Sequence, residues 1–353
     1  MKNDRKLRVM LVEDSPTVQT LLCHIIDNDP RLQLAAVCVS AEEALEAIGQ
    51  VAPDVISMDI RLPGIDGLEA TRRIMSERPT PIVVIADSVH DSTLGIAMNA
   101  LKAGALTVVE KPSGVTAASY SAISATIATQ LFIMSKVPVI RRRATAVHNS
   151  GGSIRSSPAM PPGPVTIVGI GASTGGPPAL ANVLGGLPPD FPTPILVVQH
   201  MGAAFMEGFA SWLSGQTPLR VKLAENREIP QAGTVYVAPG DRHLELATGN
   251  FLRLTTNPPL VSQRPAANFL FQSLARVAGS KAVGVLLTGM GEDGARGLLE
   301  MKEAGAFTVA EDESTAVVYG MPAAAVRLGG VSVSLPQDLI APRLLQITTE
   351  QTL

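Results

Sequence analysis

The sequence predicts an α/β protein with two sheets of mostly parallel strands, joined by a linker. The chain has 353 residues, and at roughly 150 residues per domain this length corresponds to about two domains. In both halves, short runs rich in β-branched residues alternate with segments of helical periodicity, which is typical of parallel sheets. Residues 135–164 lie between the halves and are rich in Pro, Gly and Ser, without Asp or Glu.

The first half, residues 1–134, is predicted to form a five-stranded, doubly wound parallel sheet. Ser40 followed by Glu43 is a capping box that indicates the start of the second helix. Apolar residues spaced by three and four predict an amphipathic last helix: Ile123, Ile127, Leu131 and Met134. The expected strands are, in chain order, 8–12, 34–39, 55–58, 82–85 and 106–109.

Residues 135–164 are predicted to be a flexible linker, because their composition buries too little apolar surface to offset the entropy lost on ordering. The second half, residues 165–353, is predicted to be another α/β domain with a mostly parallel, Rossmann-like sheet. Its expected strands are 166–170, 195–198, 235–238, 282–287, 307–310 and 331–335, and its expected helices include 207–213, 269–278 and 295–304.

Charge and cysteine content exclude several classes of protein. The chain has 28 Lys and Arg against 31 Asp and Glu, so it lacks the positive surplus that nucleic-acid binding usually needs. Its two cysteines are too few for a disulfide framework. The N-terminus shows no secretory signal, and Ser and Thr dilute the uncharged stretch 112–135. We therefore expect a cytoplasmic protein without membrane insertion.

Charged side chains follow the ends of three predicted strands in the first half. Glu13 and Asp14 follow the first strand, Asp59 follows the third, and Lys111 follows the fifth. Because the carboxyl ends of parallel strands meet at one edge of a sheet, we expect these groups to cluster. Carboxylates in this arrangement suit Mg²⁺, and an aspartate can act as a nucleophile toward phosphorus. Taken singly, each residue would be an ordinary helix cap or turn residue.

In the second half, the first predicted strand runs into Gly171-Ala172-Ser173-Thr174-Gly175. This segment satisfies G-x-S-x-G and predicts a tight turn that exposes Ser173 beside a helix N-terminus. A dinucleotide-binding loop is the rival interpretation. It is disfavoured because Thr174 stands where that fingerprint has Gly or Ala, and because no acidic residue ends the second strand.

A serine nucleophile needs a base, and His200 follows the second strand of this half. Asp293 follows the strand predicted at 282–287, so all three side chains should reach the same edge. We expect His200 to act as the base and Asp293 to fix its orientation. His243 is the alternative base. Two main-chain N–H groups are candidates to stabilise an oxyanion, those of Thr174 and Met290.

These motifs resemble known families. With Leu62-Pro63-Gly64-Ile65-Asp66-Gly67 after Asp59, and with Lys111-Pro112, the first half resembles the receiver domain of response regulators. Nearly the whole chain resembles the CheB family of chemotaxis protein-glutamate methylesterases. The motifs that carry this second resemblance are GIGASTGG at 169–176, VQHM at 198–201, APGDRH at 238–243, LTGMGEDG at 287–294 and YGMP at 319–322.

The receiver resemblance implies that Asp59 accepts a phosphoryl group from a histidine kinase of the chemotaxis type. It also implies that Glu13, Asp14 and Asp59 hold Mg²⁺ and that Lys111 contacts the phosphoryl oxygen. The CheB resemblance implies hydrolysis of glutamate γ-methyl esters on methyl-accepting chemotaxis receptors, with release of methanol, and deamidation of receptor glutamines. It implies no cofactor for the esterase chemistry.

One position departs from the receiver pattern. The hydroxyl residue that receivers carry at the end of the fourth strand falls on Ala86, and Ser88 could replace it only if the loop shifts. The phosphorylation switch is therefore expected to be altered or weak. For regulation, our hypothesis is that the unphosphorylated first domain packs over the Ser173 edge.

Two other functions stay open. One is a serine hydrolase for small esters, although such enzymes order their triad Ser, Asp, His. The other is a response regulator whose output domain binds a nucleotide or DNA without catalysis.

Overall fold

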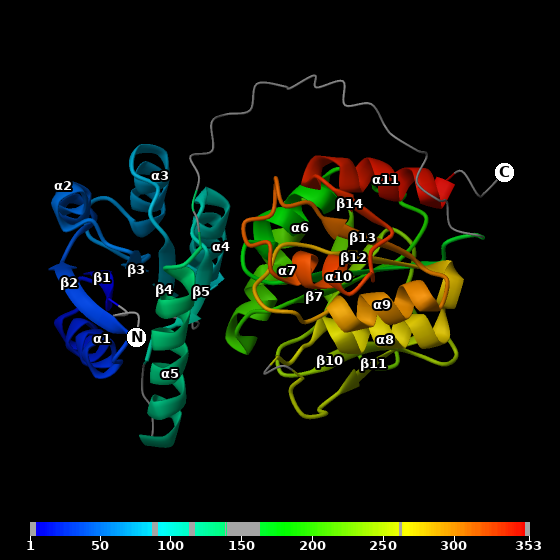
Figure 1. Cartoon of the computed structure of the whole chain (residues 1–353), viewed down its shortest axis with the longest axis horizontal. Coiled ribbons are helices and arrows are strands. Elements are labelled where there is room, and N and C mark those ends of the chain that lie inside the picture. Colours follow the sequence, from blue (N-terminus) through cyan, green and yellow to red (C-terminus); the bar gives the residue numbers. More distant parts are fainter. Residues whose placement is uncertain are drawn as a thin grey trace. The chain divides into compact units, whose positions relative to one another are not determined.

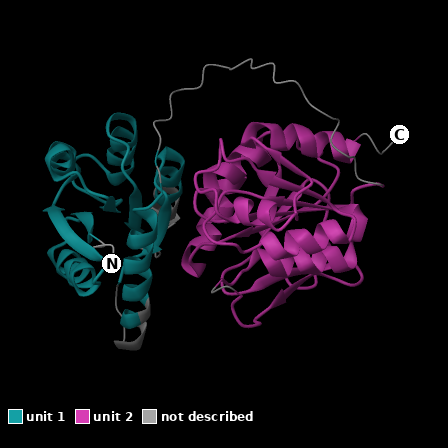
Figure 2. Cartoon of the chain, in the orientation of Figure 1, with its two compact units in different colours: residues 1–149 teal, residues 150–353 magenta. Residues whose placement is uncertain are grey.

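The computed structural model describes residues 5–86, 91–112, 117–137, 139, 163–260 and 263–349. The chain divides into two compact units, residues 1–149 and 150–353 (Figure 2). Most of the predicted linker, at 138 and 140–162, and Ser88 lie outside the described residues. None of the described helices combines the length and the hydropathy needed to cross a bilayer.

The first unit contains a five-stranded parallel sheet in the order β2-β1-β3-β4-β5 (Figure 1). Helices α1 and α5 pack together, as do α2 with α3 and α3 with α4. All five predicted strands are confirmed, with ends that move by no more than two residues. The elements are β1 (Leu7–Val12), α1 (Pro16–Asn28), β2 (Leu32–Cys38), α2 (Ala41–Val51), β3 (Val55–Asp59), α3 (Gly67–Glu77), β4 (Ile82–Ala86), α4 (Asp91–Ala103), β5 (Thr107–Glu110) and α5 (Ala117–Met134).

Local sequence signals explain two of these helices. The Ser40 hydroxyl accepts a hydrogen bond from the Glu43 N–H at 3.2 Å, which caps α2 as predicted. The Glu43 carboxylate accepts instead from the Val39 N–H, one residue before the cap. In α5, the residues spaced by three and four face the core: Ile127, Leu131 and Met134 are buried, and Ile123 is partly buried.

The second unit contains a seven-stranded sheet in the order β14-β13-β12-β6-β7-β9-β8, and every neighbouring pair is parallel. Six of these strands are predicted by the sequence, and the edge strand β8 is not. The strands are β6 (Ile167–Ala172), β7 (Ile195–Gln199), β8 (Arg220–Leu223), β9 (Thr234–Val237), β12 (Ala282–Leu286), β13 (Phe307–Glu311) and β14 (Val333–Leu335).

Helices cover this sheet, and α8 and α9 run side by side (Figure 1). A two-stranded antiparallel hairpin, β10 (His243–Ala247) with β11 (Phe251–Thr255), packs on α8. The sequence analysis missed this hairpin, although Gly249-Asn250 at its turn is a hairpin signal and both residues have positive φ. The helices are α6 (Gly176–Gly185), α7 (Met206–Ser214), α8 (Ala267–Val277), α9 (Ala295–Glu303), α10 (Met321–Arg327) and α11 (Gln337–Thr349).

Two glycines of β6 allow α8 to lie close against the sheet. A Cβ atom on Gly169 would come within 2.4 Å of the Leu274 side chain, and one on Gly171 within 2.9 Å of the Ala267 side chain. Because packed interiors leave no space for such atoms, larger residues here would push α8 outward. The Gly-x-Gly of this strand therefore serves helix packing, and it brings the N-terminus of α8 to the carboxyl end of β6.

Candidate active site

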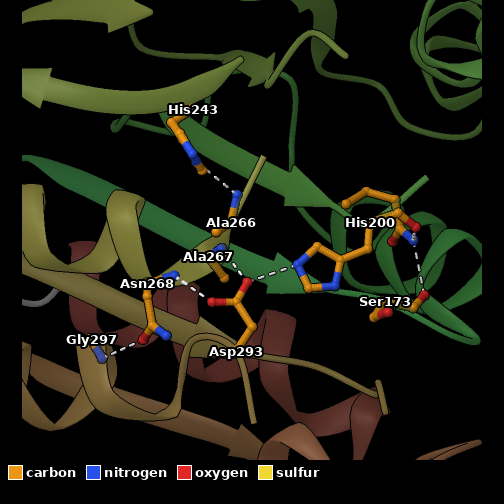
Figure 3. A network of polar contacts seen from close by, with 9 residues as sticks. Ser173, His200, His243, Ala266, Ala267, Asn268, Asp293 and Gly297 are labelled. Atoms are coloured by element: carbon orange, nitrogen blue, oxygen red, sulfur yellow. Dashed lines mark hydrogen bonds and ion pairs between the residues drawn. The ribbon is translucent and has the colours of Figure 1, made fainter. Parts of the chain in front are cut away.

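The candidate site of the second unit lies where three neighbouring strands end. Strands β12, β6 and β7 are adjacent in the sheet. Ser173 directly follows β6, His200 directly follows β7, and Asp293 lies in the loop after β12. Residues far apart in the sequence thus come together at one edge, as predicted (Figure 3). Main-chain bonds extend the strand pairing to this edge, since the Ser173 N–H donates to the Thr288 carbonyl at 3.0 Å.

The Ser173 turn has the strand, turn and helix arrangement that the sequence predicts. Strand β6 ends at Ala172 and α6 begins at Gly176. Gly175 has φ +75°, and a Cβ atom there would come within 2.5 Å of Val317. Only glycine suits both demands without strain. The chain therefore reverses sharply after Ser173, which leaves this side chain partly exposed at the sheet edge.

His200 and Asp293 form a buried pair. His200 Nε2 lies 2.8 Å from Asp293 Oδ2, and the two side chains are 6% and 3% exposed. Ser173 lies beside the His200 ring on the side away from Asp293 (Figure 3). The imidazole therefore turns Nε2 to the carboxylate and Nδ1 toward the hydroxyl. In chymotrypsin-type triads the two nitrogens have the reverse roles.

Asp293 is held by the first turn of α8. Its Oδ2 accepts from the Ala267 N–H at 2.6 Å, and its Oδ1 accepts from the Asn268 N–H at 3.1 Å. The Asn268 side chain accepts in turn from the Gly297 N–H of α9 at 2.7 Å. A helix N-terminus favours negative charge, because its first N–H groups have no partner within the helix. The carboxylate is thus fixed in place and electrostatically stabilised.

His243, the alternative base, is fully buried and has both ring nitrogens engaged by the main chain. Nδ1 accepts from the Ala266 N–H at 3.2 Å, so Nε2 carries the proton and donates to the Pro258 carbonyl, also at 3.2 Å. The ring stacks on Phe269, with centroids 3.9 Å apart. Burial lowers the pKa of His243 and keeps the ring neutral. Neither nitrogen is available to Ser173, so His243 supports the start of α8 instead (Figure 3).

The two candidate oxyanion donors lie in the loops after β6 and β12. The main-chain hydrogen bonds of the described residues give no carbonyl partner to the N–H of Thr174 or of Met290. A side chain joins the two loops, because the Thr288 hydroxyl donates to the Thr174 carbonyl at 2.9 Å. The Thr288 N–H donates in turn to Glu311, a buried carboxylate at the end of β13, at 2.8 Å. Sequence analysis missed Glu311, although it too follows a strand to the same edge.

The charged edge of the first unit also assembles as predicted. Lys111 Nζ lies 2.8 Å from Asp59 Oδ2 and 3.0 Å from Glu13 Oε2, and all three side chains are buried. Asp14 is exposed beside them. One carboxylate oxygen from each of Glu13, Asp14 and Asp59 lies within 4.8 Å of the others.

Burial raises the pKa of Asp59 and of Glu13, and for Glu13 the neighbouring charge of Asp59 adds to the effect. Lys111 opposes both shifts. Burial also acts to lower the pKa of Lys111, but its pairing with the two carboxylates outweighs this, so its pKa is raised. The first unit therefore holds a crowded acidic cluster that one ammonium group only partly compensates.

This cluster fits a divalent cation such as Mg²⁺. Among the described residues, the buried Glu13 Oε2 accepts no hydrogen bond, although it forms an ion pair with Lys111 Nζ at 3.0 Å. This oxygen is therefore a candidate ligand atom for a cation. Mg²⁺ binds oxygen ligands, usually one or two carboxylates together with water and phosphate oxygens, and this cluster can supply such carboxylates.

Ala86 ends β4 opposite Glu110 and is 1% exposed. A methyl group therefore stands where the receiver pattern has a hydroxyl. It lies at the end of β4, which is the neighbour of β3, the strand that ends with Asp59. Ser88, the alternative hydroxyl, lies outside the described residues.

The first unit has the sheet topology of a receiver domain and an acidic edge. The second unit is a parallel α/β unit that brings a hydroxyl, an imidazole and a carboxylate to one edge of its sheet. Together they define a response regulator with a hydrolase as its second unit. A family model of the response regulator receiver domain matches residues 9–118, and one of the CheB methylesterase matches residues 168–344. The chain belongs to the CheB methylesterase family, which confirms the resemblance predicted from its motifs.

Similar proteins match along almost their whole length. A protein-glutamate methylesterase/protein-glutamine glutaminase of Paramagnetospirillum magneticum is 52% identical over 96% of this chain and 97% of its own. One of Nitrosospira multiformis is 41% identical over 98% of both chains. The crystal structure of the Thermotoga maritima CheB methylesterase catalytic domain is 40% identical, with a TM-score of 0.51, and covers 52% of this chain and 98% of that one.

Proposed function

We propose that this protein hydrolyses glutamate γ-methyl esters on methyl-accepting chemotaxis receptors and deamidates receptor glutamines, by means of Ser173, His200 and Asp293. The observation that carries the proposal is the 2.8 Å contact between His200 Nε2 and Asp293 Oδ2, with Ser173 on the opposite side of the ring (Figure 3). Since the methylated receptor helices are cytoplasmic, the enzyme acts in the cytoplasm.

In the proposed reaction, Ser173 Oγ attacks the ester carbonyl while His200 Nδ1 takes its proton. The imidazolium that forms is stabilised by Asp293, whose own position is set by the N-terminus of α8. His200 then protonates the departing methoxide, and methanol leaves. A water molecule, deprotonated by the same histidine, attacks the acyl-enzyme and releases glutamate.

The Thr174 and Met290 N–H groups donate to the oxyanion of each tetrahedral intermediate. A glutamine side chain presents an equivalent carbonyl, with ammonia as the leaving group, so one site serves both activities.

In the first unit, we propose that Asp59 accepts a phosphoryl group from a histidine kinase and that this modification raises esterase activity. Glu13, Asp14 and Asp59 would hold Mg²⁺, which supplies charge neutralisation for phosphoryl transfer. Lys111 already contacts the Asp59 carboxylate at 2.8 Å, so it is placed to pair with a phosphoryl oxygen on that residue.

The catalytic proposal is tested with a chemotaxis-receptor fragment that carries tritiated methyl esters. Ser173→Ala in the full chain should lower methanol release by about a thousandfold or more, because the nucleophile is lost. Ser214→Ala, a change at an exposed residue of α7, is the matched control and should stay within about twofold of wild type. Substantial methanol release by Ser173→Ala would refute the assignment.

The regulatory proposal is tested in the same assay with acetyl phosphate as phosphodonor. The ratio of activities with and without acetyl phosphate should exceed one in the wild type and fall to one in Asp59→Asn, because an amide cannot accept the phosphoryl group. Asp27→Asn, a change at an exposed residue of α1, should keep the wild-type ratio. An unchanged ratio in Asp59→Asn would contradict control through Asp59.

A further inference from the structure

Gln199, the last residue of β7, joins the main chains of the proposed nucleophile and base. Its side chain is buried, with the residue 1% exposed. Its Nε2 donates to the Ser173 carbonyl at 2.9 Å and to the His200 carbonyl at 3.0 Å (the dashed line ending at Ser173 in Figure 3). One amide group thus contacts the main chain of both residues.

The position of this amide matters because strand pairing stops here. The register between β6 and β7 ends with Ala172 opposite Gln199, and the last main-chain bond runs from the His200 N–H to the Ala172 carbonyl at 3.0 Å. Beyond this point two carbonyl oxygens face the same space, where they would repel each other without a shared donor. The Gln199 amide supplies that donor and so extends the hydrogen bonding between β6 and β7 by one position.

Gly176 makes room for the same amide. A Cβ atom at this position would lie 2.0 Å from Gln199 Oε1 and 2.9 Å from the Ala172 side chain. Gly176 does not have a positive φ, so space and not backbone conformation explains the glycine. The second glycine of the Ser173 turn thus serves the Gln199 amide.

The carbonyl oxygen of the Gln199 amide indicates a function beyond packing. Gln199 Oε1 is buried and has no hydrogen-bond partner among the described residues. An unpaired buried carbonyl is unfavourable. A hydrophobic residue of similar length would avoid this cost at a position that served packing alone.

We infer that Gln199 is a positioning residue that sets the separation of the Ser173 and His200 main chains and so aligns nucleophile and base. This inference rests on the catalytic roles proposed above. Gln199 contacts His200 only through the main-chain carbonyl, and among the described residues no hydrogen bond joins its amide to the His200 ring or the Asp293 carboxylate. It therefore controls alignment and not the basicity of the imidazole.

Gln199→Met in the full chain tests the inference, because methionine keeps the length and burial but removes both donors. With the tritiated receptor fragment, we expect kcat to fall by about ten- to a hundredfold, as for a misalignment of an ångström or less. The value of KM and the kinetic pKa of the base should stay unchanged. Thr308→Val is the matched control. It removes the partly buried bonds of the Thr308 hydroxyl to the Ser332 N–H and hydroxyl, near the start of β13 in the same sheet, and should leave kcat within twofold.

Gly176→Ala provides a second variant that acts on the same amide from the other side. It should lower kcat at least as much as Gln199→Met, because the added methyl group would meet both the Gln199 amide and the Ala172 side chain. In a Gln199→Ala background only the Ala172 contact remains, so the fall in kcat should be smaller than in the wild type. The inference is overturned if folded Gln199→Met keeps wild-type kcat, or if Gly176→Ala has its full effect without the Gln199 side chain. Ser173→Ala, assayed in parallel, separates the two proposals, since its retention of activity would refute the catalytic proposal itself.

Discussion

The two units each place a buried aspartate at the carboxyl edge of a parallel sheet, but they satisfy its charge differently. Asp293 receives two main-chain N–H groups of α8 and the imidazole of His200. Asp59 pairs with Lys111 and accepts a long hydrogen bond of 3.3 Å from the Arg61 N–H. One carboxylate oxygen of Glu13 and one of Asp14 lie within 4.8 Å of an Asp59 oxygen.

The difference accounts for the opposite roles proposed above for one residue type at the same place in a fold. Fixed main-chain donors hold the Asp293 carboxylate in one orientation, which suits a group that orients a base and does not react. The Asp59 carboxylate has a raised pKa and few fixed donors, so it keeps lone pairs free for a cation or for phosphorus.

Among the variants that test this comparison, Asp293→Asn is expected to have the largest effect on kcat. The amide loses the charge that stabilises the imidazolium, and its NH₂ group must face either an N–H of α8 or His200. We expect kcat for methanol release to fall by on the order of 10³ to 10⁴, by analogy with the Ser-His-Asp template. Glu292→Gln, a change at the exposed neighbour, should stay within about twofold. An Asp293→Asn enzyme with more than a tenth of wild-type activity would contradict the role proposed for the Asp293 carboxylate.

His243→Phe tests how the α8 turn that holds Asp293 is itself supported. Phenylalanine keeps the stack on Phe269 but leaves the Ala266 N–H and the Pro258 carbonyl unpaired. We expect a loss of about 1–3 kcal/mol in the unfolding free energy of the second unit, measured in urea.

His243→Asn should recover part of that loss, because its Oδ1 can accept from the Ala266 N–H. If His243→Phe instead abolished catalysis and left the free energy of unfolding unchanged, His243 and not His200 would be the base.

The smallest expected effect is a change in the unfolding temperature of the first unit with Mg²⁺ and pH. The pKa values of Glu13 and Asp59 are raised in the folded state, so their favourable contribution to stability is present at low pH and is lost as the pH rises through these values. Mg²⁺ replaces the protons and offsets the loss. Its addition should therefore raise the unfolding temperature of this unit by about 5 °C at pH 8 and by less at pH 5.

Calorimetry of the full chain, with chelator and with Mg²⁺, measures this difference. Asp59→Asn should reduce the Mg²⁺-induced rise at pH 8. An equal rise at both pH values in the wild type would show that these carboxylates do not titrate as described.

Strand ends were predictable from the sequence, because a local apolar pattern indicates where each strand ends. In a parallel sheet, the carboxyl ends of the strands then lie at the same edge. This is why Ser173, His200 and Asp293 come together as predicted, and why Asp59 meets Lys111. The groups that hold these residues were not predictable. The Ala267 N–H reaches Asp293 only because two glycines of β6 let α8 approach, which depends on packing between distant segments.

The same limit applies to His243 and Gln199. The role of His243 depends on a hairpin whose turn signal was overlooked, and on a bond to the main chain more than 20 residues further on. Gln199 precedes His200 in the sequence, but nothing in that sequence indicates that its side chain crosses to Ser173.

The order of strands in the second unit also constrains how the protein acquires activity during folding. Ser173 and His200 follow strands β6 and β7, which are consecutive in the chain. Asp293 follows β12, which lies beside β6 in the sheet but is separated from β7 by residues 200–281 of the chain. A nascent or truncated chain that ends before β12 lacks the acid of the proposed triad. Enzymatic turnover by that triad is therefore a late reporter of folding, because it requires β12 to pair with β6, and the paired residues Ala282 and Ile167 are far apart in the sequence.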